Sequence, residues 1–331
     1  MPAQAAPQVD GYVWANSPSV ASYVASGYER NSTDGTVQIT RSSRGVYQVR
    51  FTGMAVSGGV AHARPYGVGN TGICTVSSWS PSGSDELVGV RCFDASGVPA
   101  DSLFTASFTN RTTSTGSLAY LWANDPAART PYVPSSAYSY DSTGGTSRIY
   151  KQSTGLYMMY LGAVDAHYPV TQDNGVYEIT AYGINPVRCE VYGENDEWPT
   201  PIAVLCVDAK GTPVDARFSV TYAHGVSLLG TTGARANAYL RHGWPTPTTF
   251  WAAGYWGPGG APTISRYGTG QYAVSFPGLS IGYGHATAGS RGDPLTYCHV
   301  AYWGSNYVRV ACYHNVTNAL IDSDFTVSLT V

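Results

Sequence analysis

The chain has 331 residues, of which 12% are charged, and its formal net charge at pH 7 is −3. This length allows two or three ordinary domains. The sequence has no cluster of Lys and Arg, so nucleic acid is not an expected partner, and no apolar run approaches the length of a membrane span. Gly, Ser, Thr and Tyr are abundant, which is typical of β-sheets with weakly charged surfaces.

The first residues, Met1 to Pro7, are rich in Ala but contain no hydrophobic signal core. This composition resembles the region that follows the cleavage site of a signal peptide. We therefore expect a mature secreted protein whose signal peptide is not part of this sequence.

Three strands recur in the same order along the chain. The first has alternating apolar residues, at 11–16, 118–124 and 236–242. The second follows a glycine and alternates Tyr with Val, Met, Phe or Leu, at 45–51, 155–161 and 270–276. The third runs through 59–64, 176–180 and 284–287. Helical periodicity of useful length is absent from the sequence, so these repeats predict an all-β protein.

A hairpin with one cysteine on each arm follows the third strand of each copy. The two cysteines of each hairpin are equidistant from the middle of its turn, and such residues face each other in an antiparallel ladder at about 4.5–5.5 Å between Cα atoms. This separation suits a disulfide, and a metal site or reduced thiols are the alternatives. The predicted pairs are Cys74–Cys92, Cys189–Cys206 and Cys298–Cys312. Disulfides imply an oxidising compartment.

A turn with fixed spacing follows the second cysteine, for example Asp94-x-x-Gly97-x-Pro99-x-Asp101. Two carboxylates that bracket a turn suggest a calcium loop, but a third and a fourth oxygen ligand are not evident. We therefore predict a turn in which the Asp side chain bonds to nearby backbone. The strand after the turn carries a phenylalanine, expected in the core, at Phe104, Phe218 and Phe325.

These elements give each copy about six or seven short strands, which suits a β-sandwich. The sequence therefore predicts three homologous β-sandwich-like repeats in tandem, over residues 1–112, 113–232 and 233–331. The joints at 110–116 and 230–233 lack long flexible Pro/Ser tracts, which favours a compact arrangement over separate beads. Spacing alone does not decide whether the copies close around a pseudo-threefold axis.

The repeated motifs are Tyr-x-Trp-Ala-Asn, Gly-x-Tyr-x-Val-x-Phe, the paired cysteines and Asp-x-x-Phe. Together they resemble tandem repeats in secreted actinobacterial proteins of unassigned function. The resemblance covers nearly the whole chain, although the third copy lacks the Trp of its first strand. It implies secretion and a bacterial source, and it carries no activity.

Alignment of the copies places His62, Glu178 and His285 at one equivalent strand position. If the copies close around an axis, these side chains could converge as a three-ligand metal site. The simpler interpretation is three unrelated polar residues on separate domains. We expect neither a metal nor a cofactor.

Enzyme signatures are weak, because the motifs of common hydrolases and phosphate-binding loops are absent from the sequence. The densest carboxylate cluster, at 190–197, surrounds the tip of the second hairpin, where a solvated acidic turn is the simplest explanation. A polysaccharide hydrolase or lyase with one site at an interface between divergent copies stays an alternative. Its candidate residues are Asp165, His167, Glu178 and His285.

Aromatic residues are the stronger functional signal, with 26 Tyr and 8 Trp. Rings on rigid loops stack on the apolar faces of sugars, although β-proteins also use such rings to pack their sheets. The candidate binding residues are Trp79, Trp244, Trp251, Tyr255, Trp256 and Trp303. The sequence favours a lectin-like, non-catalytic binding protein for carbohydrate or a cell-envelope polymer, in which several weak sites gain by avidity. A structural protein of a cell surface or filament is a further alternative, and the oligomeric state is left open.

Overall fold

The computed structural model describes residues 7–165, 175–194, 201–232, 235–240, 249–251, 254–257, 259–279, 284–292, 295–304 and 307–330. Within these residues the regular structure is almost entirely β-strand, which confirms the predicted all-β class. The helical elements described are α1 (Gly162–Asp165) and the 3-10 turn η1 (Ser136–Tyr138). No helix in this part of the chain has the length and apolar character that a membrane crossing requires.

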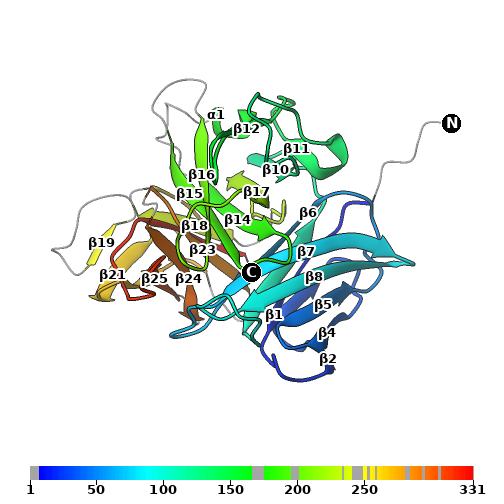
Figure 1. Ribbon diagram of the computed structural model, residues 1–331, viewed down its shortest axis with the longest axis horizontal. Coiled ribbons are helices and arrows are strands. Elements are labelled where there is room, and N and C mark those ends of the chain that lie inside the picture. Colours follow the sequence, from blue (N-terminus) through cyan, green and yellow to red (C-terminus); the bar gives the residue numbers. More distant parts are fainter. Residues whose placement is uncertain are drawn as a thin grey trace.

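We call residues 7–112, 113–232 and 233–330 segments 1, 2 and 3. Figure 1 shows them as three lobes, blue to cyan, green, and yellow to red, around the end of the chain. Segment 1 has a four-stranded sheet in the order β3-β1-β9-β6 and a second set of strands in the order β7-β8-β5-β4-β2. Its strands are β1 (Asp10–Ala15), β2 (Ser22–Val24), β3 (Glu29–Asn31), β4 (Val37–Ser43), β5 (Val46–Phe51), β6 (Val60–Pro65), β7 (Ile73–Ser82), β8 (Asp85–Phe93) and β9 (Phe104–Thr109).

Segment 2 has the same two kinds of strand set, in the orders β11-β10-β17-β14 and β12-β13-β16-β15. The first of these continues into segment 1, because β14 pairs with β7 and makes one nine-stranded sheet. The strands are β10 (Ser117–Ala123), β11 (Ser139–Asp141), β12 (Arg148–Ser153), β13 (Leu156–Tyr160), β14 (Val176–Tyr182), β15 (Val187–Glu194), β16 (Ile202–Asp208) and β17 (Arg217–His224).

Segment 3 follows the same plan, in the orders β20-β18-β26-β23 and β19-β21-β22-β25-β24. Its strands are β18 (Arg235–Leu240), β19 (Thr249–Trp251), β20 (Gly254–Trp256), β21 (Thr263–Gly268), β22 (Gln271–Ser275), β23 (His285–Ser290), β24 (Thr296–Trp303), β25 (Tyr307–His314) and β26 (Phe325–Thr330). In every segment apolar residues of both strand sets form one buried cluster, so each segment is sandwich-like.

The three cysteine pairs form disulfides as predicted. Each pair is directly opposite in the register of its hairpin, with Cα–Cα distances of 4.0–4.2 Å. The equal spacing of the cysteines from each turn therefore gave the correct pairing.

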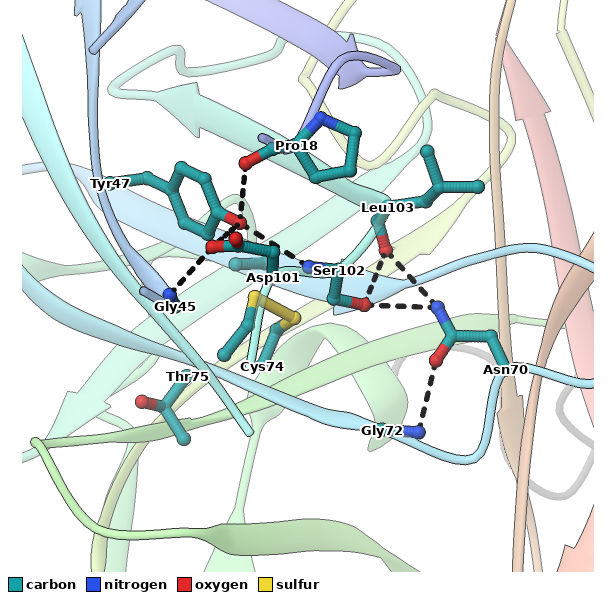
Figure 2. The surroundings of a disulfide bond; sticks show 12 residues. Pro18, Gly45, Tyr47, Asn70, Gly72, Cys74, Thr75, Asp101, Ser102 and Leu103 are labelled. Carbon is teal, nitrogen blue, oxygen red and sulfur yellow. Dashed lines mark hydrogen bonds between the residues drawn. A yellow bond between two sulfur atoms is a disulfide. The ribbon is translucent and has the colours of Figure 1, made fainter. Parts of the chain in front are cut away.

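An aspartate–tyrosine cluster fixes the strand after the hairpin in segments 1 and 3, and Figure 2 shows the one in segment 1. In segment 1 the Asp101 carboxylate accepts hydrogen bonds from the Tyr47 hydroxyl (3.0 Å), the Gly45 backbone (2.9 Å) and the Arg41 guanidinium (2.8 Å). Asp322, Tyr272 and Gly270 repeat this arrangement in segment 3. In the preceding turn the Asp94 carboxylate accepts from the backbone of Ser96 and Val98, as the backbone-bonded turn predicts.

One backbone hydrogen bond of the same kind links each segment to another. The amide of Gly183 donates to Val76, that of Gly292 to Val191, and that of Gly67 to Val300, at 2.9–3.1 Å. The acceptors lie two residues after the first cysteine of each hairpin, and all three glycines have positive φ, which favours glycine. Segment 1 thus contacts segment 2, segment 2 contacts segment 3, and segment 3 contacts segment 1, in a closed circle.

The closed circle buries polar side chains that a half-buried strand would expose. In β9 the apolar side chains of Phe104, Ala106 and Phe108 belong to the core of segment 1. The alternating residues Thr105 and Ser107 face away from that core, yet they are 3% and 2% exposed. Thr109, on the same face of β9, donates to the Leu229 carbonyl of segment 2 at 2.9 Å, as expected for the compact arrangement favoured by the short joints.

Candidate binding surface

The structure places the six predicted aromatic residues in different surroundings. Trp244 lies outside the described residues. Trp251 is the last residue of β19 and Trp256 the last residue of β20, but their side chains are outside what the structure describes. Tyr255 is on β20 and 38% exposed. Binding by these four residues stays a prediction.

Trp79 packs between segments 1 and 2. It is 8% exposed, and its indole Nε1 donates to the Gly58 carbonyl at 3.1 Å. Three rings of segment 2 surround it, with centroids 5.5–5.7 Å away, at Trp122, Tyr138 and Tyr182. Because these rings enclose the indole, Trp79 has the surroundings of a packing residue rather than of an open platform.

Trp303 has the corresponding place between segments 3 and 1, but its surroundings are more open. Its ring lies 3.6 Å from that of Trp14 and 5.5 Å from that of Tyr28, measured between centroids. Trp14 is buried, and its Nε1 donates to the Gly284 carbonyl. Trp303 is only partly buried and Tyr28 is exposed, so this aromatic junction reaches the surface.

Exposed tyrosines continue this aromatic surface onto the outer face of β21, β24 and β25. Tyr302 is 50% exposed and lies 6.5 Å from Trp303 and 6.2 Å from Tyr307, between centroids. The Arg309 guanidinium lies 5.7 Å from the Tyr307 ring and 5.0 Å from that of Tyr267, which is 48% exposed. We call Tyr267, Tyr302, Tyr307 and Arg309 the tyrosine strip.

The strip is local to segment 3. Strand register identifies the residues that hold the same positions in the other segments, and none of them is aromatic. For Tyr302, Tyr307 and Tyr267 in turn, the counterparts are Ser78, Leu87 and Ser42 in segment 1, and Gly193, Pro201 and Gln152 in segment 2. The three segments share one framework, but only segment 3 has aromatic rings at these three positions. These rings are therefore not required to build the framework.

The binding residues predicted from sequence include Trp303, which adjoins the strip, but none of the four strip residues. The prediction favoured Trp residues in loops rich in Pro and Gly, whereas the strip is built on strands. Tyr302 and Arg309 face each other across the hairpin only because a register shift between Val300 and Tyr302 changes which residues point outwards. An alignment of the three hairpins position by position could have identified the strip. It places Tyr302 where the other hairpins have Ser78 and Gly193.

The second candidate site, at the centre of the molecule, needs a correction of register. His62 pairs with Ser107, and Glu178 pairs with Thr221. Ser107 and Thr221 each lie three residues after the phenylalanine at the same strand position in their segments, Phe104 and Phe218. The residue of segment 3 at this position is Thr287, opposite Ser328. His285 lies two residues earlier, so the predicted equivalence of His285 was wrong. The period of two in a strand still leaves it on the same face.

The central residues hydrogen-bond to one another across segments. The His62 imidazole lies 3.1 Å from the Thr180 hydroxyl and 2.8 Å from that of Thr221, and the Thr287 hydroxyl donates to Glu178 at 3.2 Å. Burial raises the pKa of Glu178 to about 7, an effect that the Arg64 charge opposes. Burial lowers the pKa of His62 to about 3, with smaller contributions from the positive charges around it.

These surroundings do not resemble an accessible catalytic site. Glu178 is 2% exposed and His285 3% exposed, and His285 stacks on the Tyr12 ring at 5.0 Å. His167 lies outside the described residues, as does the side chain of Asp165 at the end of α1. Among the described residues, no three His, Cys, Asp or Glu side chains are grouped so as to hold a metal ion. A polymer cannot reach Glu178 or His285 in this arrangement.

Comparisons of the chain with protein-family models, with curated proteins and with solved structures find no match.

Proposed function

We propose that the protein is a secreted, non-catalytic binding protein that holds a carbohydrate polymer against the tyrosine strip. The observation that carries the proposal is the contiguous surface of the exposed Tyr302 and Tyr267 and the half-buried Tyr307 in segment 3. Exposed aromatic rings held on neighbouring strands need little ordering when a ligand arrives, so little conformational entropy opposes binding. The three disulfides suit the oxidising environment outside a cell.

The chemistry of the strip suits sugars. The tyrosine rings offer apolar faces to the C–H groups of a pyranose, and their hydroxyls can exchange hydrogen bonds with sugar hydroxyls. Arg309 adds up to five N–H donors beside two of the rings and can bind hydroxyl or carboxylate oxygens. Because the strip follows strands β24 and β25 rather than closing a pocket, it suits a chain of sugars better than a single one.

The proposed test is incubation of the protein with a panel of insoluble neutral and acidic polysaccharides. Both the loss of protein from solution and the release of soluble sugars are measured. Depletion without released sugars is the expected result, and preference for acidic polymers would assign that selectivity to Arg309. Released sugars would replace the proposal with a hydrolase or lyase, and no depletion by any polymer would remove carbohydrate from it.

A further inference from the structure

The hairpins of all three segments meet at a small cavity in the centre of the molecule. Cys74, Cys189 and Cys298 all line it, and its volume is about 30 Å³. A cavity needs roughly 10–15 Å³ of such volume for each water, so this one has room for about two waters or one small ion. Its lining includes the ionisable side chains of Arg64, Arg188, Glu190, Tyr297 and His299.

The charges around the cavity do not balance. Among the described lining residues there are two guanidinium groups and one carboxylate. Arg64 occupies that carboxylate, since its two terminal nitrogens lie 2.9 and 3.1 Å from the two oxygens of Glu190. The second cation, Arg188, has no carboxylate partner of its own among the described residues.

The hydrogen bonds that Arg188 donates within the described residues go to neutral groups. Its Nη2 donates to the carbonyls of Thr71 (2.6 Å) and Gly72 (3.4 Å), and its guanidinium carbon lies 4.0 Å from the centroid of the Tyr297 ring. Arg188 is 7% exposed, and its Nη1 is buried without a hydrogen-bond partner in the described structure. Burial lowers the pKa of this guanidinium, and Tyr297 and the Glu190 charge, which is shared with Arg64, oppose the shift only in part.

One further buried donor and one buried acceptor adjoin the cavity. Arg64 is 8% exposed, and its Nε has no hydrogen-bond partner in the described part of the structure. His299 is 2% exposed, and its Nε2 donates to the Gly67 carbonyl at 3.3 Å. Burial lowers the pKa of His299 to about 4, so the ring is neutral and Nδ1 is an acceptor, without a partner among the described residues. Arg64, Arg188 and His299 come from segments 1, 2 and 3 respectively.

We propose that this cavity is a binding site for a small monoanion, of the size of chloride, which neutralises Arg188 and joins the three segments. A buried charge without a counterion is strongly unfavourable, and arginine does not lose its proton to avoid the cost. An anion beside the guanidinium supplies the missing charge and an acceptor for the unused donors. The site belongs to the framework and does not depend on the tyrosine strip.

Thermal unfolding in different sodium salts at equal ionic strength tests this proposal. The salts are chloride and formate, which are small enough for the cavity, and gluconate, which is not. A ligand that binds only the folded state raises Tm as its concentration rises. We expect a Tm at least about 2 °C higher in chloride or formate than in gluconate, and the better of the two identifies the preferred anion.

Two variants make the test specific. Arg188→Met keeps the length of the side chain without its charge, so Tm should become equal in all three salts and should not fall in gluconate. Arg44→Met removes an exposed arginine and should keep the native salt dependence. Bromide soaked into crystals of the native protein should give an anomalous peak beside Arg188. Equal Tm of the native protein in all salts, a salt dependence that persists in Arg188→Met, or no bromide at the cavity would each overturn the proposal.

Discussion

Arg64 of β6 and Glu190 of β15 form a two-point ion pair between segments 1 and 2, with N–O distances of 2.9 and 3.1 Å, and both side chains are at least 86% buried. Gly289 of segment 3 lies against this pair, since a Cβ there would be 3.0 Å from a Glu190 oxygen and 3.1 Å from an Arg64 nitrogen. One ion pair therefore depends on all three segments.

Glu190→Gln should strongly destabilise the protein. The substitution leaves Arg64 and Arg188 as two buried cations, and removing one partner of a buried pair costs about 3–5 kcal/mol. Urea unfolding of the variant checks this value against Asp34→Asn, which changes an exposed carboxylate and should cost less than about 0.5 kcal/mol. A loss below about 1 kcal/mol for Glu190→Gln would contradict the central role of the pair.

Glu178→Gln should alter how stability depends on pH. The folded state raises the pKa of Glu178 to about 7, above the value of about 4.3 in an unfolded chain. The folded state thus binds more protons, so the contribution of Glu178 is fully present below pH 4.3 and is lost as pH rises to 7. The native-minus-variant difference in the free energy of unfolding, measured from pH 4.5 to 8, should therefore fall as pH rises.

The buried histidines act in the opposite direction in both proteins and cancel in this comparison. Burial lowers the pKa of His62 to about 3 and those of His285 and His299 to about 4. Their contribution to the free energy of unfolding is present above pH 6.5 and is lost as pH falls from about 6.5 towards their folded pKa values. A native-minus-variant difference that does not change between pH 4.5 and 7 would show that Glu178 is not neutral in the folded state.

Asp101→Ala should cost about 1–3 kcal/mol, because the Gly45 amide loses its acceptor and the Tyr47 hydroxyl keeps only the Pro18 carbonyl. The hydrogen bond with Arg41 is the main reason that the pKa of Asp101 falls to about 2. The native protein should therefore lose this contribution as pH falls from about 4 to about 2, and the variant should not. Chemical unfolding between pH 2 and 6 measures the difference, and parallel curves for the two proteins would exclude the ionised Asp101 as its source.

Sequence patterns predicted what is local. The cysteine pairs and the strand that carries Phe104 follow from spacing within one hairpin and from a period of two. The centre of the molecule depends on which sheets cover one another, and alternation in a strand does not contain that information. Thr105 and Ser107 have the pattern of a solvated face, yet both are buried, and Thr109 on the same face bonds to the distant Leu229. The predicted alignment placed His285 two residues away from its observed position. Alternation could not reveal this error, because a shift of two residues leaves a side chain on the same face of the strand.

The tyrosine strip could be predicted only in part, because it combines residues from a hairpin with a register shift and from a strand about 35–40 residues earlier. Trp303 adjoins the strip in the sequence. The tyrosines of the strip have no distinctive spacing. The non-aromatic residues at matching positions in the other segments become apparent only when the strands are superposed by register.

The most direct test of the proposed function is the affinity of strip variants for the polysaccharide that the panel identifies. Loss of an aromatic anchor costs about 1–2 kcal/mol or more at a binding surface, so Tyr302→Ala and Tyr307→Ala should each raise Kd roughly fivefold to thirtyfold. Tyr192→Ala removes a tyrosine of similar exposure, 39%, from segment 2 and should leave Kd unchanged. Native Kd values for both strip variants, with native Tm values, would contradict the assignment of the binding surface.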